Sequence, residues 1–286
     1  MHRFLRFVLG VAGRLPLRLL HAAGGLLGWA IYGISPKYRA HMRFNLAQAG
    51  YRDATIRREA IVSAGCMLTE LPALWFRPYE EVVALVREVT GAEAVFGALE
   101  RGKSLLLLTP HMGCFEITAQ YAARHTPITV LYRAPKIGVL EPLMREGRSR
   151  PNVRLVPADL SGVREIFASL KRGEPLGFLP DQVPGEGEGE WAEFFGRPAY
   201  TMTLVGRLQQ ASDAAVVFCY AERLAGGKGF KLHFAALDAP LSLDRLESAR
   251  QVNERVEGLV RQCPVQYLWG YNRYKRPAGA PAPPRR

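Results

Sequence analysis

The chain has 286 residues, of which 48% are hydrophobic and 22% charged, so it is long enough for one large α/β domain or two small ones. Its net charge of +12 indicates an anionic partner, such as nucleic acid, lipid headgroups or an acidic protein, unless the charge is only a solvated basic surface. The four cysteines are scattered, without C-x-x-C or metal-finger spacing, which argues against a disulfide framework and favours reduced thiols.

The N-terminal residues 1–35 are apolar but repeatedly interrupted by basic side chains. Taken as a helix, they place the basic residues within an arc of about 120°: Arg3, Arg6, Arg14, Arg18 and His21. The opposite face is apolar: Phe4, Leu5, Val8, Leu15 and Leu19. This pattern predicts a membrane anchor lying in the interface and drawn to anionic lipid, with an ordinary core helix as the alternative. Residues 22–34 are uncharged but shorter than the ~20 residues that span a bilayer, and the arginines make a cleaved signal peptide a poor fit.

Downstream of the anchor, helices are predicted first and then a regular alternation of strands and helices. The first predicted helices are residues 51–77, 79–89 and 91–102. The short apolar run 105–108 is typical of a strand buried on both faces. Further strands are predicted at 128–133, 153–157, 176–180, 214–222 and 229–236, and further helices at 114–124, 138–149, 161–172, 200–211 and 243–262.

That alternation predicts an α/β fold with a mostly parallel central sheet flanked by helices. We expect one domain over residues 36–276, followed by a disordered, basic, Pro-rich tail at 277–286. The acidic, glycine-rich residues 185–190 suggest a mobile lid or a solvated loop.

Residues 97–104, GALERGKS, match the P-loop pattern G-x-x-x-x-G-K-[ST]. A phosphate-binding loop needs a strand before it and a helix after it, so that the helix N-terminus faces the phosphates. Here a predicted helix precedes the motif and a predicted strand follows it. The order is reversed, and nucleotide binding is therefore not expected.

His111 and Glu116 stand five positions apart, directly after the predicted strand 105–108. On one regular helix they would point roughly 140° apart, but Thr109-Pro110 keeps helix from starting there. We expect His111 on a loop at the carboxyl end of the strand, folded back over the first turn of the next helix toward Glu116. A carboxylate on one imidazole nitrogen would leave the other as a general base for acyl transfer, although many such pairs are only structural.

Other chemistries fit this segment less well. Cys114 could act as an acyl-accepting nucleophile, but on the predicted helix it faces the core. A thioesterase using water as acceptor remains open, whereas no G-x-S-x-G elbow supports a serine hydrolase. The histidines form no H-E-x-x-H or other ligand set, so no metal is expected.

The H-x-x-x-x-E motif after a buried strand resembles the H-x4-D/E motif of glycerolipid-type acyltransferases. More of the chain is similar to one branch, the late (secondary) lipid A acyltransferases of the lauroyl/myristoyl type. The similar blocks occur in the branch's order and cover most of residues 105–277: VLYRAP at 130–135, GRSR at 147–150, a block through PDQ at 180–182, EFFGRPAYTMT at 193–203, and CPVQYLWGYNRYKRP at 263–277.

The resemblance implies transfer of a fatty acyl chain from an acyl carrier protein thioester to a hydroxyl of a lipid A precursor. It implies His111 as general base, Glu116 as its orienter, and Arg148 as the group that stabilises the oxyanion or holds donor phosphate. Arg133 and Asp181 would shape the site, with a purely structural ion pair as the alternative. Lastly, Phe194 and Phe195 would line the acyl channel, unless they are plain core.

The resemblance further implies work at the cytoplasmic face of the bacterial inner membrane, with no cofactor beyond the carrier-bound thioester. The expected partners are acyl carrier protein, a phosphorylated glycolipid and the anionic membrane surface. Departures from the branch's pattern, such as Tyr-Asn-Arg-Tyr-Lys at 271–275, leave the acceptor open, so a lysophospholipid or another glycolipid is an alternative. A non-enzymatic basic membrane binder is the alternative from another class, while no zinc finger, RRM-like block or helix-turn-helix signal supports nucleic acid.

Overall fold

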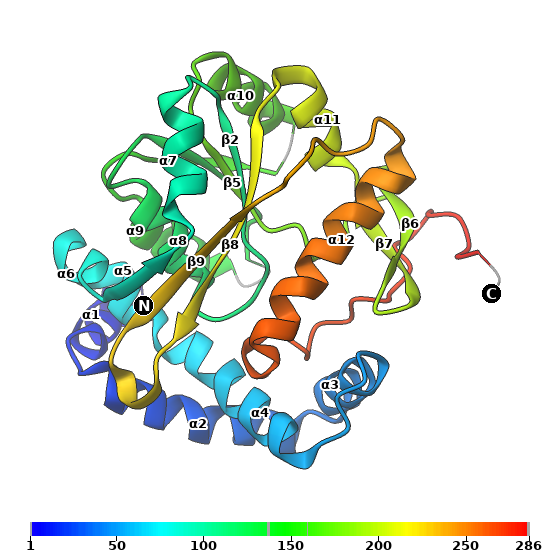
Figure 1. The fold of residues 1–286 in the computed structure, drawn as a ribbon. Helices are drawn as coiled ribbons and strands as arrows, with labels where there is room; N and C mark the ends of the chain where they lie inside the picture. The colour runs from blue at the N-terminus through cyan, green and yellow to red at the C-terminus, as the bar shows by residue number, and fades with distance from the viewer. Residues whose placement is uncertain (1, 136–137, 159, 285–286) are drawn as a thin grey trace.

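The computed structural model describes residues 2–135, 138–158 and 160–284. Its centre is a seven-stranded sheet of order β1-β9-β8-β2-β5-β3-β4 (Figure 1). The strands are as follows: β1 Val86–Thr90, β2 Leu105–Leu108, β3 Ile128–Tyr132, β4 Val153–Pro157, β5 Leu176–Phe178, β8 Ala215–Arg223 and β9 Phe230–Ala236.

The sheet is mostly parallel, as predicted. Strands β8, β2, β5, β3 and β4 run in one direction, and only the β8–β9 pairing is antiparallel. Strand β2 lies at the centre, and all four of its leucines are buried. Leu106 and Leu108 pack into the core on one face of the sheet, whereas Leu105 and Leu107 pack into the core on the other. The continuous apolar run is therefore explained by burial on both faces.

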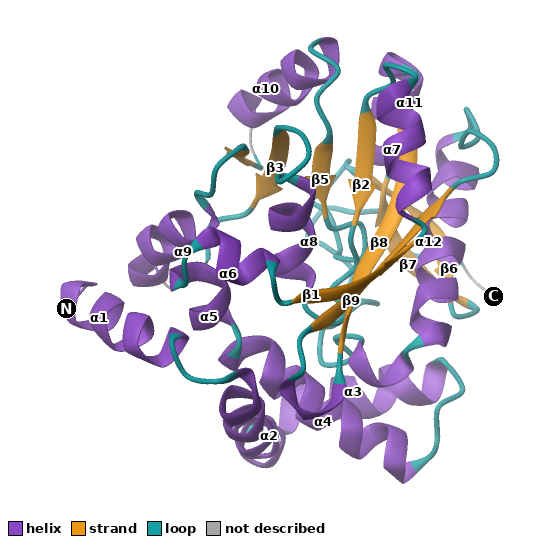
Figure 2. Cartoon of the chain, turned by 60° about the vertical axis from the view of Figure 1, so that its left-hand side comes forward, coloured by secondary structure: helices purple, strands orange, loops and turns teal. Residues whose placement is uncertain are grey.

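Helices cover both faces of the sheet (Figures 1 and 2). One core is filled by α10 Leu160–Lys171, α11 Leu204–Ser212 and α12 Arg245–Gln262. The other is filled by α5 Leu71–Phe76, α6 Tyr79–Val83, α7 Ala92–Glu100 and α8 Phe115–Ala122. Short 3-10 turns lie at Gly138–Leu140, Ala225–Gly227 and Pro264–Gln266, and α9 Glu141–Arg148 follows the first of them.

Three predicted elements differ from the structure. The predicted helix 79–89 is a short helix, α6, followed by the edge strand β1, which pairs with β9. The predicted helix 51–77 divides at Glu70 into α4 Ala54–Thr69 and α5, because Glu70 and Pro72 begin a new helical turn. A hairpin of β6 Gly189–Phe194 and β7 Arg197–Met202 replaces the start of the predicted helix 200–211 and also takes in Gly189 and Glu190 of the expected loop.

The segment 97–104 has the reversed order that the sequence indicated. Helix α7 precedes it and β2 follows it, so no helix N-terminus faces the turn. Its lysine, Lys103, instead forms a surface ion pair with Asp213 at 2.9 Å. The segment therefore matches the phosphate-binding pattern in sequence but lacks the strand–loop–helix order that phosphate binding requires.

The N-terminal segment forms two helices, whereas the arc of basic residues was predicted for a single helix. Helix α1 covers His2–Gly13 and α2 covers Leu17–Ile34, with Pro16 starting the second. Of the arc, Arg3, Arg6, Arg14 and Arg18 are exposed as expected, and Arg6 also pairs with Glu146 of α9. His21 points inward to the buried Glu70, which corrects its place on the basic face.

Helix α2 packs closely on α4, beneath the sheet (Figure 1). Gly24, Gly28 and Gly65 make this approach possible, because a Cβ on Gly65 would lie 1.8 Å from the Gly24 carbonyl oxygen and 2.5 Å from the Gly28 nitrogen. Small residues spaced by four are a common way to bring two helices into backbone contact. The predicted anchor is therefore packed directly on the following domain.

The outer faces of α1 and α2 carry large apolar side chains in solvent. Phe4, Leu26 and Ile34 are 72%, 77% and 82% exposed, respectively. By length and composition, α2 is the one helix among the described residues that could cross a membrane, with a mean hydropathy of 1.2. Figure 2 shows α1 reaching outward from the sheet-bearing body. An exposed apolar surface of this kind, flanked by arginines, favours contact with a membrane.

Part of the tail that was predicted to be disordered lies against the domain. Ala280 is fully buried beside Val183 and Tyr200, and the Pro281 carbonyl accepts a hydrogen bond from Trp191 Nε1 at 3.0 Å. The prediction was wrong for these residues because it rested on composition, which misses a buried alanine. Residues 285–286 of that prediction lie outside the described residues.

Candidate active site

Four side chains lie at the carboxyl edge of the parallel strands, and the sequence had singled out all of them except Arg223. His111 follows β2, Arg133 follows β3, Asp181 follows β5, and Arg223 ends β8. Strands β8, β2, β5 and β3 are neighbours and parallel, so their carboxyl ends lie together. Ligands in open α/β sheets bind at this edge.

The imidazole of His111 pairs with Asp181, which lies on the neighbouring strand end. His111 Nδ1 lies 2.8 Å from Asp181 Oδ1, and the His111 backbone N–H donates to Oδ2 at 2.9 Å. One carboxylate thus holds both the loop backbone and the ring, which fixes the ring orientation. With Nδ1–H donating to the carboxylate, Nε2 carries the free lone pair.

The second ring nitrogen of His111 faces Gln182. Gln182 Nε2 lies 3.0 Å from His111 Nε2, so the amide donates to the lone pair. The imidazole side chain is 16% exposed, and it is therefore reachable from solvent. Nε2 is a base held in one orientation, with a neutral donor that a substrate hydroxyl could replace.

Asp181 is almost fully buried, yet it is ionised. Burial alone would raise its pKa, but the positive charge that His111 carries when protonated, together with its hydrogen bonds, outweighs burial, and the pKa of Asp181 lies below the ordinary value of 3.8. The neighbouring Tyr267 phenol is also buried, and burial together with the charge of Asp181 raises its pKa well above 10.0. Tyr267 therefore stays a neutral hydrogen-bond donor beside an anionic carboxylate.

Glu116 has a different partner from the one expected. It lies in the first turn of α8 and accepts from Arg148 through Nε at 2.9 and 3.1 Å and through Nη2, while Trp75 Nε1 lies 3.3 Å away. The direct His111–Glu116 pair predicted from their spacing is therefore wrong, because α8 turns Glu116 toward α9 and not toward the loop. Burial acts to lower the pKa of Arg148, but the Glu116 charge and hydrogen bonds raise it above its ordinary value, so the guanidinium stays charged.

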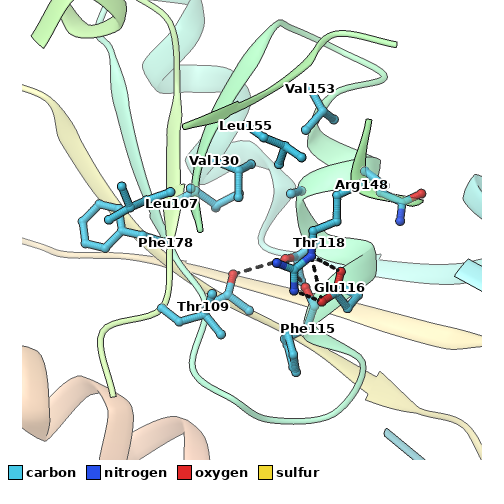
Figure 3. Close-up of a pocket in the computed structure, with 15 residues that line it drawn as sticks. Leu107, Thr109, Phe115, Glu116, Thr118, Val130, Arg148, Val153, Leu155 and Phe178 are labelled. Carbon is cyan, nitrogen blue, oxygen red and sulfur yellow. Dashed lines mark hydrogen bonds and ion pairs between the residues drawn. The ribbon is translucent and has the colours of Figure 1, made fainter. Parts of the chain in front are cut away.

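An apolar pocket opens beside the Glu116–Arg148 pair (Figure 3). It has an empty volume of about 570 Å³, counted with the solvent at its mouth. The apolar walls come from β2, β3, β4 and β5 and include Leu107, Val130, Val153, Leu155 and Gly177. Phe115 joins the pocket to the histidine, since its ring lines the pocket and lies 5.0 Å from the His111 ring. The walls have the chemistry of an acyl-chain site.

The remaining expected residues do not take part in these contacts. Arg133 is exposed, and no ion pair joins it to Asp181, whose partner is His111. Phe194 and Phe195 are 2% and 8% exposed and belong to the main core, where their rings lie tilted against Tyr267 and Trp269, respectively. They do not line the pocket beside Arg148, and their expected role in an acyl channel stays a prediction. Phe194 ends β6, and Phe195 lies at the turn of the β6–β7 hairpin.

Cys114 is buried at the start of α8. Burial raises the pKa of its thiol well above 9.0, so the thiolate is disfavoured. This environment is the opposite of the one that activates a nucleophilic cysteine. Within the described residues, no three histidine, cysteine, aspartate or glutamate side chains are grouped as metal ligands.

Residues 4–276 match the family of bacterial lipid A biosynthesis acyltransferases. The chain belongs to this family and is an acyltransferase. It is 28% identical over 233 residues to a lipid A biosynthesis lauroyltransferase of Escherichia coli K12, covering 79% of this chain and 75% of that protein. It is 26% identical over 246 residues to the myristoyltransferase of the same organism, covering 83% and 74%. A lipid A biosynthesis acyltransferase of Haemophilus influenzae is 26% identical over 274 residues, covering 92% and 84%.

The family resemblance inferred from the sequence is thus confirmed. The sequence analysis did not, however, single out three residues that contact the site. Gln182 on Nε2, Trp75 on Glu116 and Tyr267 beside Asp181 were not singled out. Gln182 carried a signal, since it ends the Pro-Asp-Gln block. Trp75 comes from α5, and no local pattern relates it to α8.

Proposed function

We propose that this acyltransferase moves a fatty acyl chain from an acyl carrier protein thioester to a hydroxyl of a lipid A precursor, at the cytoplasmic face of the inner membrane. The observation that supports this most is the His111–Asp181 pair, 2.8 Å apart, beside an apolar pocket. Family membership supports the acyl transfer and the lipid A acceptor. The donor and the membrane face are inferred from charge and exposed surface.

His111 is the proposed general base. The acceptor hydroxyl replaces Gln182 at Nε2 and gives its proton to that nitrogen as its oxygen attacks the thioester carbonyl carbon. Asp181 holds Nδ1–H and stabilises the imidazolium that forms. The carbon–sulfur bond of the tetrahedral intermediate then breaks, the thiolate takes the proton from Nε2, and an ester is left. In this mechanism Asp181 orients the imidazole of His111, a role that the family resemblance had implied for Glu116.

Arg148 is the proposed electrostatic element. Its guanidinium is fixed by Glu116 from one side and lines the pocket mouth. A fixed cation there would stabilise the carbonyl oxygen as it becomes negative, or hold the phosphate of the donor. The acyl chain would occupy the pocket between Val130, Leu155 and Gly177. Because the thioester is already activated, the proposed reaction needs no cofactor.

The partners follow from charge and surface. The net charge of +12 suits an acidic carrier protein, a phosphorylated glycolipid and anionic lipid. The exposed apolar faces of α1 and α2, with Arg3, Arg14 and Arg18 in solvent, suit a membrane surface.

The test is mass spectrometry of lipids after the pure protein is incubated with membranes and with carrier-bound donors of several chain lengths. A gain of one acyl group on a lipid A precursor, absent with His111→Ala and kept with Cys114→Ala, supports the proposal. A gain only on glycerophospholipid, or free acid released equally with and without acceptor, overturns the acceptor assignment. Equal transfer by wild type and His111→Ala overturns the mechanism.

A further inference from the structure

The loop that carries His111 is held at nearly every peptide group. Cys114 N donates to Ala221 O at 2.8 Å, and Gly113 N donates to Gln266 O at 2.9 Å. The His111 carbonyl accepts from Leu268 N at 2.9 Å. Gly113 adopts φ +57, and a Cβ there would lie 1.9 Å from the Ala221 carbonyl oxygen, so the loop is pressed against β8.

The Gly113 carbonyl of this turn faces a buried arginine. Arg223 Nη2 donates to Gly113 O at 2.6 Å. The guanidinium is in turn fixed by Glu70, with Nε to Oε2 at 2.7 Å and Nη2 to Oε1 at 2.8 Å, and by Ser63 at 3.0 Å. The Arg223 and Glu70 side chains are 6% and 1% exposed. No substrate is needed to explain where this arginine points.

Two further elements meet the same pair. Gln266 Oε1 accepts from the Arg223 backbone N–H at 2.8 Å, and its Nε2 donates to the Arg223 carbonyl at 3.1 Å. His21 of α2 lies with Nε2 3.2 Å from Glu70 Oε2. The pair therefore joins the His111 loop, the segment after α12, helix α4 and the N-terminal helix α2.

We propose that Arg223, held by Glu70, is a positioning residue that sets the His111 loop, and that His21 ties this support to helix α2. The inference rests on the proposed base role of His111. Arg223 does not touch the reacting atoms, and it acts through the Gly113 carbonyl. Without its N–H donors, that carbonyl and the Glu70 carboxylate would be buried without compensation, so the turn would shift to find partners and carry Nε2 away from the acceptor hydroxyl.

Arg223→Lys tests this, because lysine keeps the charge but has no fork to reach Glu70 and Gly113 together. We expect kcat to fall between about 10- and 100-fold, KM for donor and acceptor to change little, and the acid limb of the kcat–pH profile to move. Glu70→Gln should likewise lower kcat and leave KM for donor and acceptor nearly unchanged. Arg250→Lys, in an exposed ion pair with Glu247 and Glu254, is the matched control and should retain wild-type kinetics.

Ser63→Ala removes one Arg223 contact and leaves the ion pair, so it serves if the stronger variants do not fold. It should lower kcat about two- to fivefold with KM unchanged. A lower unfolding midpoint with wild-type kcat and pH profile in Arg223→Lys and Ser63→Ala would show a merely structural pair and overturn the inference. That result differs from failure of the proposed function, in which wild type itself transfers no acyl chain or His111→Ala remains active.

Discussion

Two regions of this molecule each combine a histidine, an arginine and carboxylates, and they use them differently. At the sheet edge, His111 and Arg148 have separate carboxylates, Asp181 and Glu116, and their side chains are 16% and 22% exposed. In the interior, His21 and Arg223 share the single carboxylate of Glu70, which is 1% exposed.

The two regions differ in whether a ligand could replace the hydrogen-bond partners of the histidine and the arginine. Separate carboxylates leave Nε2 of His111 to the neutral amide of Gln182 and Nη1 of Arg148 to the sulfur of Met144, and a ligand at the pocket mouth could replace both partners. The shared Glu70 is saturated, and the remaining Arg223 donors go to Gly113, Ser63 and Gln266. Similar groups therefore support chemistry in one region and loop position in the other, according to access and not to residue type.

The strongest way to break this comparison is to remove each histidine. His111→Asn should lower kcat by about 10³-fold or more while leaving the unfolding midpoint nearly unchanged, because it removes the base and keeps the shape. His21→Asn should lower kcat by no more than about tenfold. Steady-state acyl-transfer assays on both variants decide this, and a larger loss from His21→Asn would contradict the division of roles.

Removing each arginine compares the two regions by stability. Arg223→Met should cost about 3–5 kcal/mol of unfolding free energy, because it leaves the Glu70 charge buried and unpaired. Arg148→Met should cost less, about 1–3 kcal/mol, because Arg148 is 22% exposed and its removal would let water reach the buried Glu116 carboxylate, and it should reduce activity more than stability. Denaturant unfolding measures both, and equal costs would show that the pocket pair is also a structural one.

The two carboxylates at the sheet edge can be separated from one another. Asp181→Asn should lower kcat about 10²-fold, because the amide no longer compensates the imidazolium and favours the wrong tautomer. Glu116→Gln should act mainly on the donor, through looser placement of Arg148. Varying donor and acceptor concentrations separates the two effects. If Glu116→Gln removed the acid limb of the pH profile and Asp181→Asn did not, the original His111–Glu116 assignment would return.

A smaller effect is expected along the pocket wall. Gly177 lines the pocket, and an added Cβ would lie 3.4 Å from Ile128 Cδ1 and 3.5 Å from Val130 Cγ2. Gly177→Val should therefore favour shorter acyl donors, by about fourfold for each methylene displaced. Comparing kcat/KM across donors of increasing length tests this, and an unchanged chain preference would move the acyl chain out of this pocket.

The smallest effect concerns how the stability of the fold depends on pH below neutrality. The pKa of Glu70 lies below its ordinary 4.5, since the charge of Arg223 outweighs burial, and the pKa of Asp181 lies below 3.8. Lowered folded-state values stabilise the fold above the ordinary values, and this contribution is lost as pH falls toward the lowered ones. These two carboxylates should therefore leave the midpoint temperature of thermal unfolding constant between pH 6 and 8, and the midpoint should fall below about pH 4.5. Glu70→Gln should lessen that acid dependence.

Much of the fold could be predicted from the sequence, because β2 to β5 and α7 to α10 follow regular hydrophobic patterns bounded by Gly and Pro. The site could be predicted only in part. His111 was placed correctly at a strand end, but its partner lies 70 residues later, and only the pairing of β2 with β5 brings Asp181 to it. Glu116 was paired with its sequence neighbour, since the turn of α8 toward α9 is set by packing.

The glycine contact between α2 and α4 has a practical consequence. Deleting the first 35 residues to obtain a soluble enzyme would uncover the backbone of α4 around Gly65 and remove the imidazole beside Glu70. The two N-terminal helices are thus not a module separable from the domain that carries His111, and a truncated form would be a damaged protein whose kinetics say little about the parent.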